Sequence, residues 1–232
     1  MLQTLKPYIP HQIRRLLRAG LATFENKSDW EFKWQKYSWV DLWKSPEVKA
    51  KCLEYWRRFR HLDDIRRIIP FDNNTTVLDV GCGIGSVLHY LPGNRIGVDP
   101  LGERYKTIYD YPFEVVTAPG ESLPFSSETF DVVFSSNCID HTTDPDEVLK
   151  QIKRVLKSDG HFVLTCEVFS ENLGARNKAH PHSMTENRLR SLAMRHFKIV
   201  AEWNEPWYGM RGYCLGEPPT DQRELIFILQ KP

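Results

Sequence analysis

The stretch VLDVGCGIG, residues 77–85, decides the fold of this chain. An apolar run leads into glycines at alternate positions, Gly81, Gly83 and Gly85, and residues 85–90 then have the character of a helix. Glycine lets the backbone turn sharply and approach a ligand closely, because it has no Cβ atom. A strand, a glycine loop and a helix in this order predict an open α/β sheet whose ligand lies at the carboxyl edge of the strands.

Two residues near this loop bear on the nature of the ligand. A dinucleotide-binding loop, G-x-G-x-x-G/A, would have glycine or alanine at position 86, where this chain has Ser86. Asp79 stands two residues before the first glycine, and its carboxylate suits a ligand with an ammonium group better than a pyrophosphate. The loop therefore argues against NAD.

From residue 75 onward the chain alternates between strand and helix patterns. Helices are predicted over residues 85–90, 144–156 and 185–195. Strands are predicted over residues 76–80, 95–98, 113–117, 130–135, 160–167, 197–203 and 224–229. Such alternation predicts an α/β fold: a Rossmann-like, seven-stranded and mostly parallel sheet with helices on both faces.

The first 70 residues have a different texture, and we assign them to an N-terminal helical and aromatic cap on a main domain of residues 71–232. Residues 49–69 predict one long helix that ends at Pro70. Four of the seven tryptophans lie between residues 30 and 43. Rings at this density must be buried, either in a packed subdomain or as a cover over an apolar acceptor pocket.

The N-terminus predicts a short amphipathic helix over residues 13–21, with Arg14, Arg15 and Arg18 on its polar side. This helix either docks on the main domain with a solvated basic face or makes a peripheral contact with an anionic membrane surface. We find no secretory signal and no apolar run of membrane-spanning length, so the expected location is cytoplasmic.

Charge and cysteine usage exclude some classes of partner. A formal net charge of +1 provides no global field for nucleic acid, so no nucleic-acid partner is expected. The five cysteines are widely spaced and lack the C-x-x-C pattern of zinc sites, so no metal is expected and the thiols fit a reducing compartment. The sequence leaves the oligomeric state open.

Four further segments follow the glycine loop in order: IGVD (96–99), GESLPF (120–125), FDVVFSSNCIDH (130–141) and LKSDGHFVL (156–164). Together with the loop they resemble the class I S-adenosylmethionine-dependent methyltransferases, specifically the small-molecule group of type 11 and ubiquinone-biosynthesis-like enzymes. The resemblance covers residues 75–167 and continues more loosely to the C-terminus. It implies S-adenosylmethionine as the cofactor, a reversed final strand, and methyl transfer as the reaction.

The resemblance also implies which residues hold the cofactor. In that family the glycine loop surrounds the methionine half, and an acid at the end of the second strand binds both ribose hydroxyls. Many members have an aspartate two residues before Glu121; this chain has Pro119, so Glu121 or backbone carbonyls would accept from the adenine amino group. The implied cofactor-binding residues are Asp79, Gly81, Cys82, Gly83, Gly85, Asp99, Pro100, Gly120, Glu121, Ser122 and Asn137.

The expected acceptor is a hydroxyl of a small-molecule, glycan or lipid-linked substrate, for which a base within hydrogen-bond reach is needed. Three histidines are the catalytic candidates, His141, His180 and His182, each with a structural role as the alternative. The second hypothesis is methylation of carbon or nitrogen, on a quinone or an amine. The third is a cofactor-binding partner subunit without catalysis.

A long segment, residues 204–223, separates the last two predicted strands and is rich in glycine, proline and aromatic residues. A loop of this length in a compact domain is often functional. Trp207 and Tyr208 are expected either in a lid over the acceptor or in the core. Glu167, at the end of the fifth predicted strand, either faces the ligand crevice or is only a polar strand end.

Overall fold

A computed structural model describes residues 27–43, 45–171, 180–218 and 222–232. Its centre is a seven-stranded sheet, which in spatial order consists of β3 (Glu114–Val116), β2 (Asn94–Val98), β1 (Thr76–Val80), β4 (Phe130–Ser136), β5 (Leu156–Val168), β7 (Arg223–Gln230) and β6 (Lys198–Pro206). The pairs from β3 to β5 are parallel, and β7 is antiparallel to both of its neighbours. The predicted α/β sheet with a reversed final strand is therefore confirmed.

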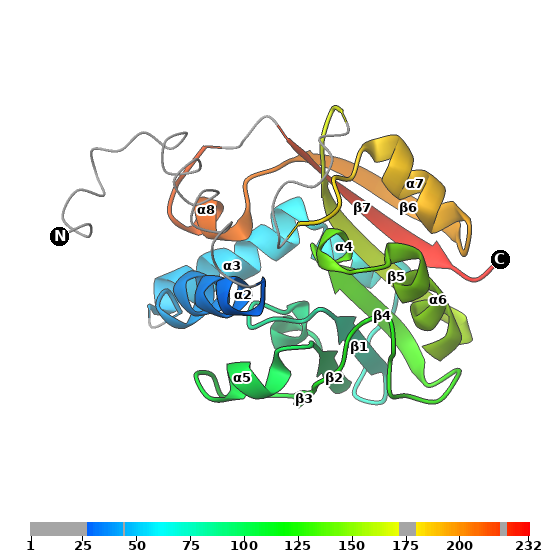
Figure 1. The fold of residues 1–232 in the computed structure, drawn as a ribbon, viewed down its shortest axis with the longest axis horizontal. Coiled ribbons are helices and arrows are strands. Elements are labelled where there is room, and N and C mark those ends of the chain that lie inside the picture. Colours follow the sequence, from blue (N-terminus) through cyan, green and yellow to red (C-terminus); the bar gives the residue numbers. More distant parts are fainter. Residues whose placement is uncertain (1–26, 44, 172–179, 219–221) are drawn as a thin grey trace.

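Helices cover both faces of this sheet, as predicted (Figure 1). One face packs against α6 (Pro145–Val155) and α7 (Glu186–Met194). The other packs against α3 (Pro46–Phe59), α4 (Leu62–Ile68), the 3-10 turn η3 (Val87–Tyr90) and α8 (Met210–Cys214). Successive side chains of β1 point to opposite faces, so Leu78 belongs to the first core and Val77 to the second. Burial on both sides explains why the central strands are continuous apolar runs.

The helix α6 illustrates how local sequence produces an element. The side chain of Asp144 accepts the N–H groups of Asp146 and Glu147 at 3.0 and 3.2 Å, and Pro145 occupies the first turn, where no N–H partner is needed. Its buried residues recur at helical spacing: Val148, Leu149, Ile152 and Val155. Cap, proline and apolar stripe together fix where this helix starts and which face it buries.

The single helix predicted over residues 49–69 is wrong, because α3 and α4 are separated at His61, whose φ of 52° is left-handed. The imidazole of His61 is held by one neighbour in sequence and by two residues that are distant in sequence. Its Nε2 lies 3.0 Å from Glu205, its ring stacks on Trp203, and its Nδ1 lies 2.9 Å from Asp64. Since two of these partners belong to β6, the helical period of residues 49–69 gave no sign of the break.

The helix predicted over residues 85–90 is reduced to the short turn η3. Ser86 accepts the N–H of Leu88 at 3.1 Å and starts the turn. Pro92 then disfavours helical dihedrals at Leu91, whose ψ of 146° is extended. A 3-10 turn, and not an α-helix, therefore follows the glycine loop.

The cap begins, within the described residues, at α2 (Lys27–Gln35), which continues as the π-helical turn η2 (Lys36–Val40). In Figure 1, α2, α3 and α8 lie together at one end of the molecule. The predicted basic helix over residues 13–21 lies outside the described residues. None of the helices in the described ranges is both long enough and apolar enough to span a bilayer.

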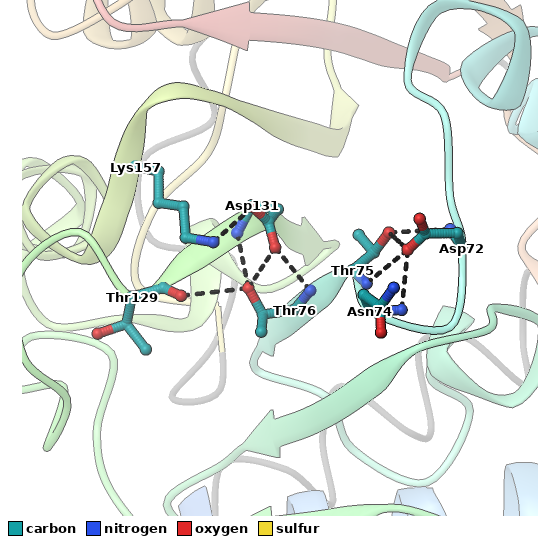
Figure 2. A network of polar contacts seen from close by, with 7 residues as sticks. All are labelled: Asp72, Asn74, Thr75, Thr76, Thr129, Asp131 and Lys157. Atoms are coloured by element: carbon teal, nitrogen blue, oxygen red, sulfur yellow. Dashed lines mark hydrogen bonds and ion pairs between the residues drawn. The ribbon is translucent and has the colours of Figure 1, made fainter.

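A polar network holds the opposite end of β1, at the amino edge of the sheet (Figure 2). Oδ2 of Asp131 accepts both the hydroxyl and the N–H of Thr76, at 2.6 and 2.8 Å, and Oδ1 lies 2.6 Å from Nζ of Lys157. These contacts join β1, β4 and β5. The network therefore fixes the register of three central strands whose other ends carry the candidate site.

Candidate functional site

A cavity of about 970 Å³ lies at the carboxyl edge of the sheet, where the glycine loop follows β1. Its walls come from the ends of four strands, from α2 and η2 of the cap, and from residues 207–212. Among the described residues, Gly83, Ser122 and His182 of the predicted site do not line it. The predicted residues that line it are Asp79, Gly81, Cys82, Gly85, Asp99, Pro100, Gly120, Glu121, Asn137, His141 and His180.

The glycine loop is packed tightly between β4 and the cap. Gly81 has a φ of 76°, and a Cβ atom there would lie 2.1 Å from Sγ of Cys138. A Cβ atom on Gly85 would lie 2.5 Å from the ring of Trp39. Both glycines are therefore required by close approach, and the cap contacts the loop directly.

Asp79 lies near the carboxyl end of β1, lines the cavity and is almost fully buried. Its Oδ2 accepts the hydroxyl of Ser86 at 2.6 Å, while its Oδ1 has no hydrogen-bond partner among the described residues. Burial raises the pKa of Asp79 to about 7, against the opposing effects of the Ser86 hydroxyl and the charge of Arg60. A buried acceptor without a partner beside a cavity is suited to a cationic group of a ligand.

Asp99 follows β2 and lines the same cavity. The N–H of Leu101 donates to its Oδ1 at 2.9 Å, and the N–H of Gly83 donates to its Oδ2 at 3.1 Å. Burial raises the pKa of Asp99 to about 6, although both N–H groups lower it. The two N–H groups fix the carboxylate, and each oxygen keeps a further lone pair that can accept a hydroxyl of a vicinal diol.

Glu121 and Asn137 both line the cavity and also support the backbone around it. Oε1 of Glu121 accepts the N–H groups of Thr143 and Asp144, at 2.7 and 3.2 Å, and so holds the chain just before α6. Asn137 adopts a left-handed φ of 53°, and its Oδ1 accepts the N–H of Glu167 at 2.8 Å. Each of these side chains therefore uses one oxygen to hold the backbone at the border of the cavity.

His141 lies in the 3-10 turn η4 (Ile139–His141), directly after β4. Its Nδ1 lies 2.7 Å from Oε1 of Glu31 in α2, and its Nε2 lies 3.8 Å from Oδ1 of Asp140. Burial lowers the pKa of His141, but the carboxylates of Asp140 and Glu31 outweigh it, and the pKa rises to about 9. The ring is consequently protonated at neutral pH in the ligand-free chain and must lose that proton before it can act as a base.

The structure brings His180 to His141 but leaves His182 apart from them. The ring centroids of His141 and His180 are 4.1 Å apart, and Trp30 of the cap meets His180 edge-on. Nε2 of His182 instead faces the carbonyl oxygen of Thr143 at 3.3 Å. Thr185 caps α7 by accepting the N–H of Arg188.

Two cap residues of the site were missed by the sequence reasoning, Glu31 and Gln35. Glu31 holds His141, and Oε1 of Gln35 accepts the N–H of Ile84 in the glycine loop at 2.9 Å. Both partners are distant in sequence, and nothing in α2 distinguishes these two side chains from solvent-exposed ones. No sequence signal could have identified them.

A buried ion pair behind the cavity was also missed. Arg60 lines the cavity, and its Nη2 lies 3.0 Å from Glu224, which is fully buried in β7 and also accepts the hydroxyl of Tyr55 at 3.1 Å. Here a signal existed. An acid at the start of an otherwise apolar strand, ELIFIL, requires a buried partner.

The late segment is only partly a loop, because it contains the end of β6 and the helix α8. Trp207 and Tyr208 line the cavity, whereas Trp203 stacks on His61 away from it. Tyr208 also packs against Phe59 of α3. Tyr208 therefore combines a wall of the cavity with packing on the cap, and Trp207 is part of the wall.

Comparison with known proteins finds similarity in the central part of the chain. Residues 78–164 match the family model described as a methyltransferase domain. The chain is 25% identical over 202 residues to a sterol 4-C-methyltransferase, strm-1, of Caenorhabditis elegans. This match covers 75% of this chain and 60% of that protein. It is 26% identical to the putative methyltransferase YrhH of Bacillus subtilis, over 68% of this chain and 89% of YrhH. A sarcosine/dimethylglycine N-methyltransferase of Halorhodospira halochloris is 34% identical over 38% of this chain and 36% of its own length.

Solved structures agree with the fold. A putative methyltransferase in complex with the Haloferax volcanii Trm112 activator has a TM-score of 0.58 at 17% identity, over 80% of this chain and 96% of that one. A Haemonchus contortus phosphoethanolamine N-methyltransferase with S-adenosylhomocysteine has a TM-score of 0.54 at 18% identity, over 75% of this chain and 52% of that one. At these identities the likeness concerns the fold alone. The chain spans 60% or less of the first curated relatives that it matches.

Proposed function

We propose that this chain, which belongs to the class I S-adenosylmethionine-dependent methyltransferases, transfers a methyl group from S-adenosylmethionine to a hydroxyl oxygen of a small-molecule, glycan or lipid-linked acceptor. One observation carries the proposal. Two buried carboxylates, Asp79 and Asp99, flank the glycine loop and face one cavity, and Oδ1 of Asp79 lacks a partner among the described residues. Burial raises the pKa values of these two groups, to about 7 and about 6, and a positive or hydrogen-bond-donating group of a ligand would compensate their ionised forms for this burial.

These residues fit the two polar ends of the cofactor. Asp79 would hold the ammonium of the methionine part, and Asp99 would accept the two ribose hydroxyls. When bound, S-adenosylmethionine supplies a methyl group activated by its sulfonium. The task of the chain is then to orient an acceptor in line with that methyl group and to keep water out. Trp39 and the other cap rings along the cavity suit the second task.

His141 is the side chain that we assign to the acceptor hydroxyl. Its Nδ1 is held by Glu31, which leaves Nε2 toward the space shared with Asp140 and His180. In this assignment Glu31 is a positioning residue, because it acts through His141. His182 is given no part, since it does not line the cavity.

Cofactor affinity tests the first half of the proposal. S-adenosylhomocysteine should bind the wild type with one site in calorimetry, and Asp79→Asn and Asp99→Asn should weaken it by at least about tenfold, the loss of one charge-assisted hydrogen bond. The exposed carboxylate Asp110 provides the control, because Asp110→Asn should bind as the wild type does. Full affinity in either site variant would refute the assignment.

An amine acceptor is the second candidate, and the lining of the cavity favours it. Trp30, Trp34 and Trp207 line the same cavity as Glu121 and Glu167. Such surroundings stabilise a cation by cation–π and charge interactions. Two of the similar proteins named above act on amines.

The two candidates differ in their dependence on histidine. Methyl transfer to a hydroxyl should fall by about 10²- to 10⁴-fold in His141→Ala, whereas transfer to an amine should change little. A screen of acceptors with His141→Ala and the wild type separates them. Cofactor binding without transfer to any acceptor would instead support the third hypothesis, a partner subunit without catalysis.

A further inference from the structure

We propose that Asp140, His141 and His180 form a binding site for one divalent transition-metal ion, such as Zn²⁺ or Mn²⁺, at the border of the cavity. One ligand atom from each of these three residues can be chosen such that all lie within 4.8 Å of one another. The residues come from two separate parts of the fold. Asp140 and His141 belong to η4 after β4, and His180 precedes α7. A backbone bond from the N–H of His182 to the carbonyl of Asp140, 3.4 Å long, ties these two parts together.

Glu31 determines which nitrogen of His141 is available. A carboxylate 2.7 Å from Nδ1 accepts the proton on that nitrogen, so the neutral ring has its lone pair on Nε2. Nε2 is also the nitrogen that faces Asp140, at 3.8 Å. A carboxylate behind a histidine whose other nitrogen faces further donors is the usual second layer of a protein metal site.

The donor set indicates the class of metal. Two imidazole nitrogens and one carboxylate oxygen suit zinc, manganese or iron, and hardly suit calcium or magnesium, which prefer oxygen ligands. Three protein ligands also leave coordination positions open. Because His141 and His180 line the cavity, a water molecule or an acceptor oxygen can reach these positions from it.

The charges around the cluster favour a cation on balance. The carboxylates of Asp140 and Glu31 are adjacent, and Asp140 is buried. The ammonium of Lys27, which donates to the carbonyl oxygen of His141, is the opposing charge among the described residues that contact His141. With a metal ion in place of the proton on Nε2 of His141, the two carboxylates outweigh the single ammonium.

This site also bears on the proposed function. A catalytic use of the metal rests on the proposed function, whereas metal binding does not. A metal on Nε2 would take the lone pair that we assigned to the acceptor proton. The metal would then acidify a coordinated acceptor hydroxyl, whose O–H bond breaks and whose proton passes to water. Metal binding itself requires neither cofactor nor methyl transfer, and so it can be measured separately.

The test is a titration of the metal-free full chain with Zn²⁺ by calorimetry and with Co²⁺ by absorption. The wild type should bind one equivalent at this site, without the strong thiolate-to-cobalt bands that any of the five cysteines would give as ligands. His141→Gln, His180→Gln and Asp140→Asn should weaken binding by at least about 100-fold, and Glu31→Gln by about 10- to 100-fold. Circular dichroism confirms that each variant is folded.

His182 offers a matched control, because it lies two residues from His180 and does not line the cavity. His182→Gln should bind metal as the wild type does. The site is overturned if the wild type binds no metal, if His180→Gln binds as tightly as the wild type, or if thiolate bands appear. Metal binding without methyl transfer would contradict the proposed function and support the metal site. Methyl transfer by a chain that binds no metal would do the reverse.

Discussion

Asp79 is held near the midpoint of its titration at neutral pH, because burial raises its pKa to about 7. A bound ammonium group favours the ionised form, and below this pKa binding must also remove a proton. We therefore expect S-adenosylhomocysteine to bind more tightly as the pH rises from about 6 to about 8, by up to about tenfold per pH unit below the pKa. Calorimetry across this range checks it. Asp79→Asn should bind weakly and with a shallower profile, to which only Asp99 still contributes, and an affinity of the wild type that falls with pH would contradict the assignment.

The same residue has the opposite effect on the ligand-free chain. The pKa of Asp79 is raised from 3.8 to about 7 on folding, so the folded state binds more protons than the unfolded state between these values. The free energy of unfolding should then decrease as the pH rises from about 4 to about 7. Urea denaturation of wild type and Asp79→Asn measures the difference. The wild type should lose stability relative to the variant across this window, and parallel curves would show that Asp79 is not shifted.

Gly81 can be compared with Gly216, which has nearly the same φ, 76° against 73°, but around whose Cβ position the described residues, apart from its chain neighbours, place no atom within 4 Å. Gly216→Ala should cost about 1–2 kcal/mol, the backbone strain alone. Gly81→Ala must in addition displace Cys138, so it should lower the free energy of unfolding clearly further and weaken cofactor binding. Chemical denaturation of both variants gives the comparison. Equal losses would mean that the contact with Cys138 is easily relieved.

Residues of the site were predictable where they lie in one contiguous motif. Asp79 and the glycines share nine residues of sequence, and Asp99 ends the next strand. Glu31 reaches His141 across 110 residues of sequence, and α2 has no pattern that marks it. Such contacts depend on how the cap docks, which no local period encodes.

Among the elements, α3 and β7 are joined by the buried pair of Arg60 and Glu224. Arg60→Met or Glu224→Leu leaves the other charge buried and should cost about 3–5 kcal/mol. The double variant should recover much of this loss, because no unpaired charge remains. A double-mutant cycle from denaturation measures the coupling. If the single losses simply add up, the two side chains do not act as a pair.

The type of an element could be predicted where one of its faces is buried, because burial leaves an apolar pattern in the sequence of the element itself. The strands β1, β4 and β7 were predictable because each is a short and largely apolar run, and α6 because its cap and apolar stripe are local. The break at His61 and the shortening of η3 were not found from periodicity. Contacts of His61 with β6 cause the first, and the influence of Pro92 on Leu91 causes the second.

At the scale of the whole molecule, the cavity exists because segments that are far apart in sequence meet at one edge of the sheet. The cap supplies Trp39, the strand ends supply Asp79 and Asp99, and the late segment supplies Trp207. In Figure 1 the cap helices α2 and α3 lie with α8 at the same end of the molecule. In the proposed function the strand ends hold the cofactor, whereas the cap and the late segment enclose the space for the acceptor.

A crystal structure of the chain with S-adenosylhomocysteine tests the central claim most directly. The ribose hydroxyls should lie within hydrogen-bond distance of Asp99, about 2.6–3.2 Å, and the ammonium should lie beside Oδ1 of Asp79. The sulfur should point toward His141 and His180. A nucleoside whose sugar lies away from Asp99, or a cavity that stays without the compound at saturating concentration, would contradict it.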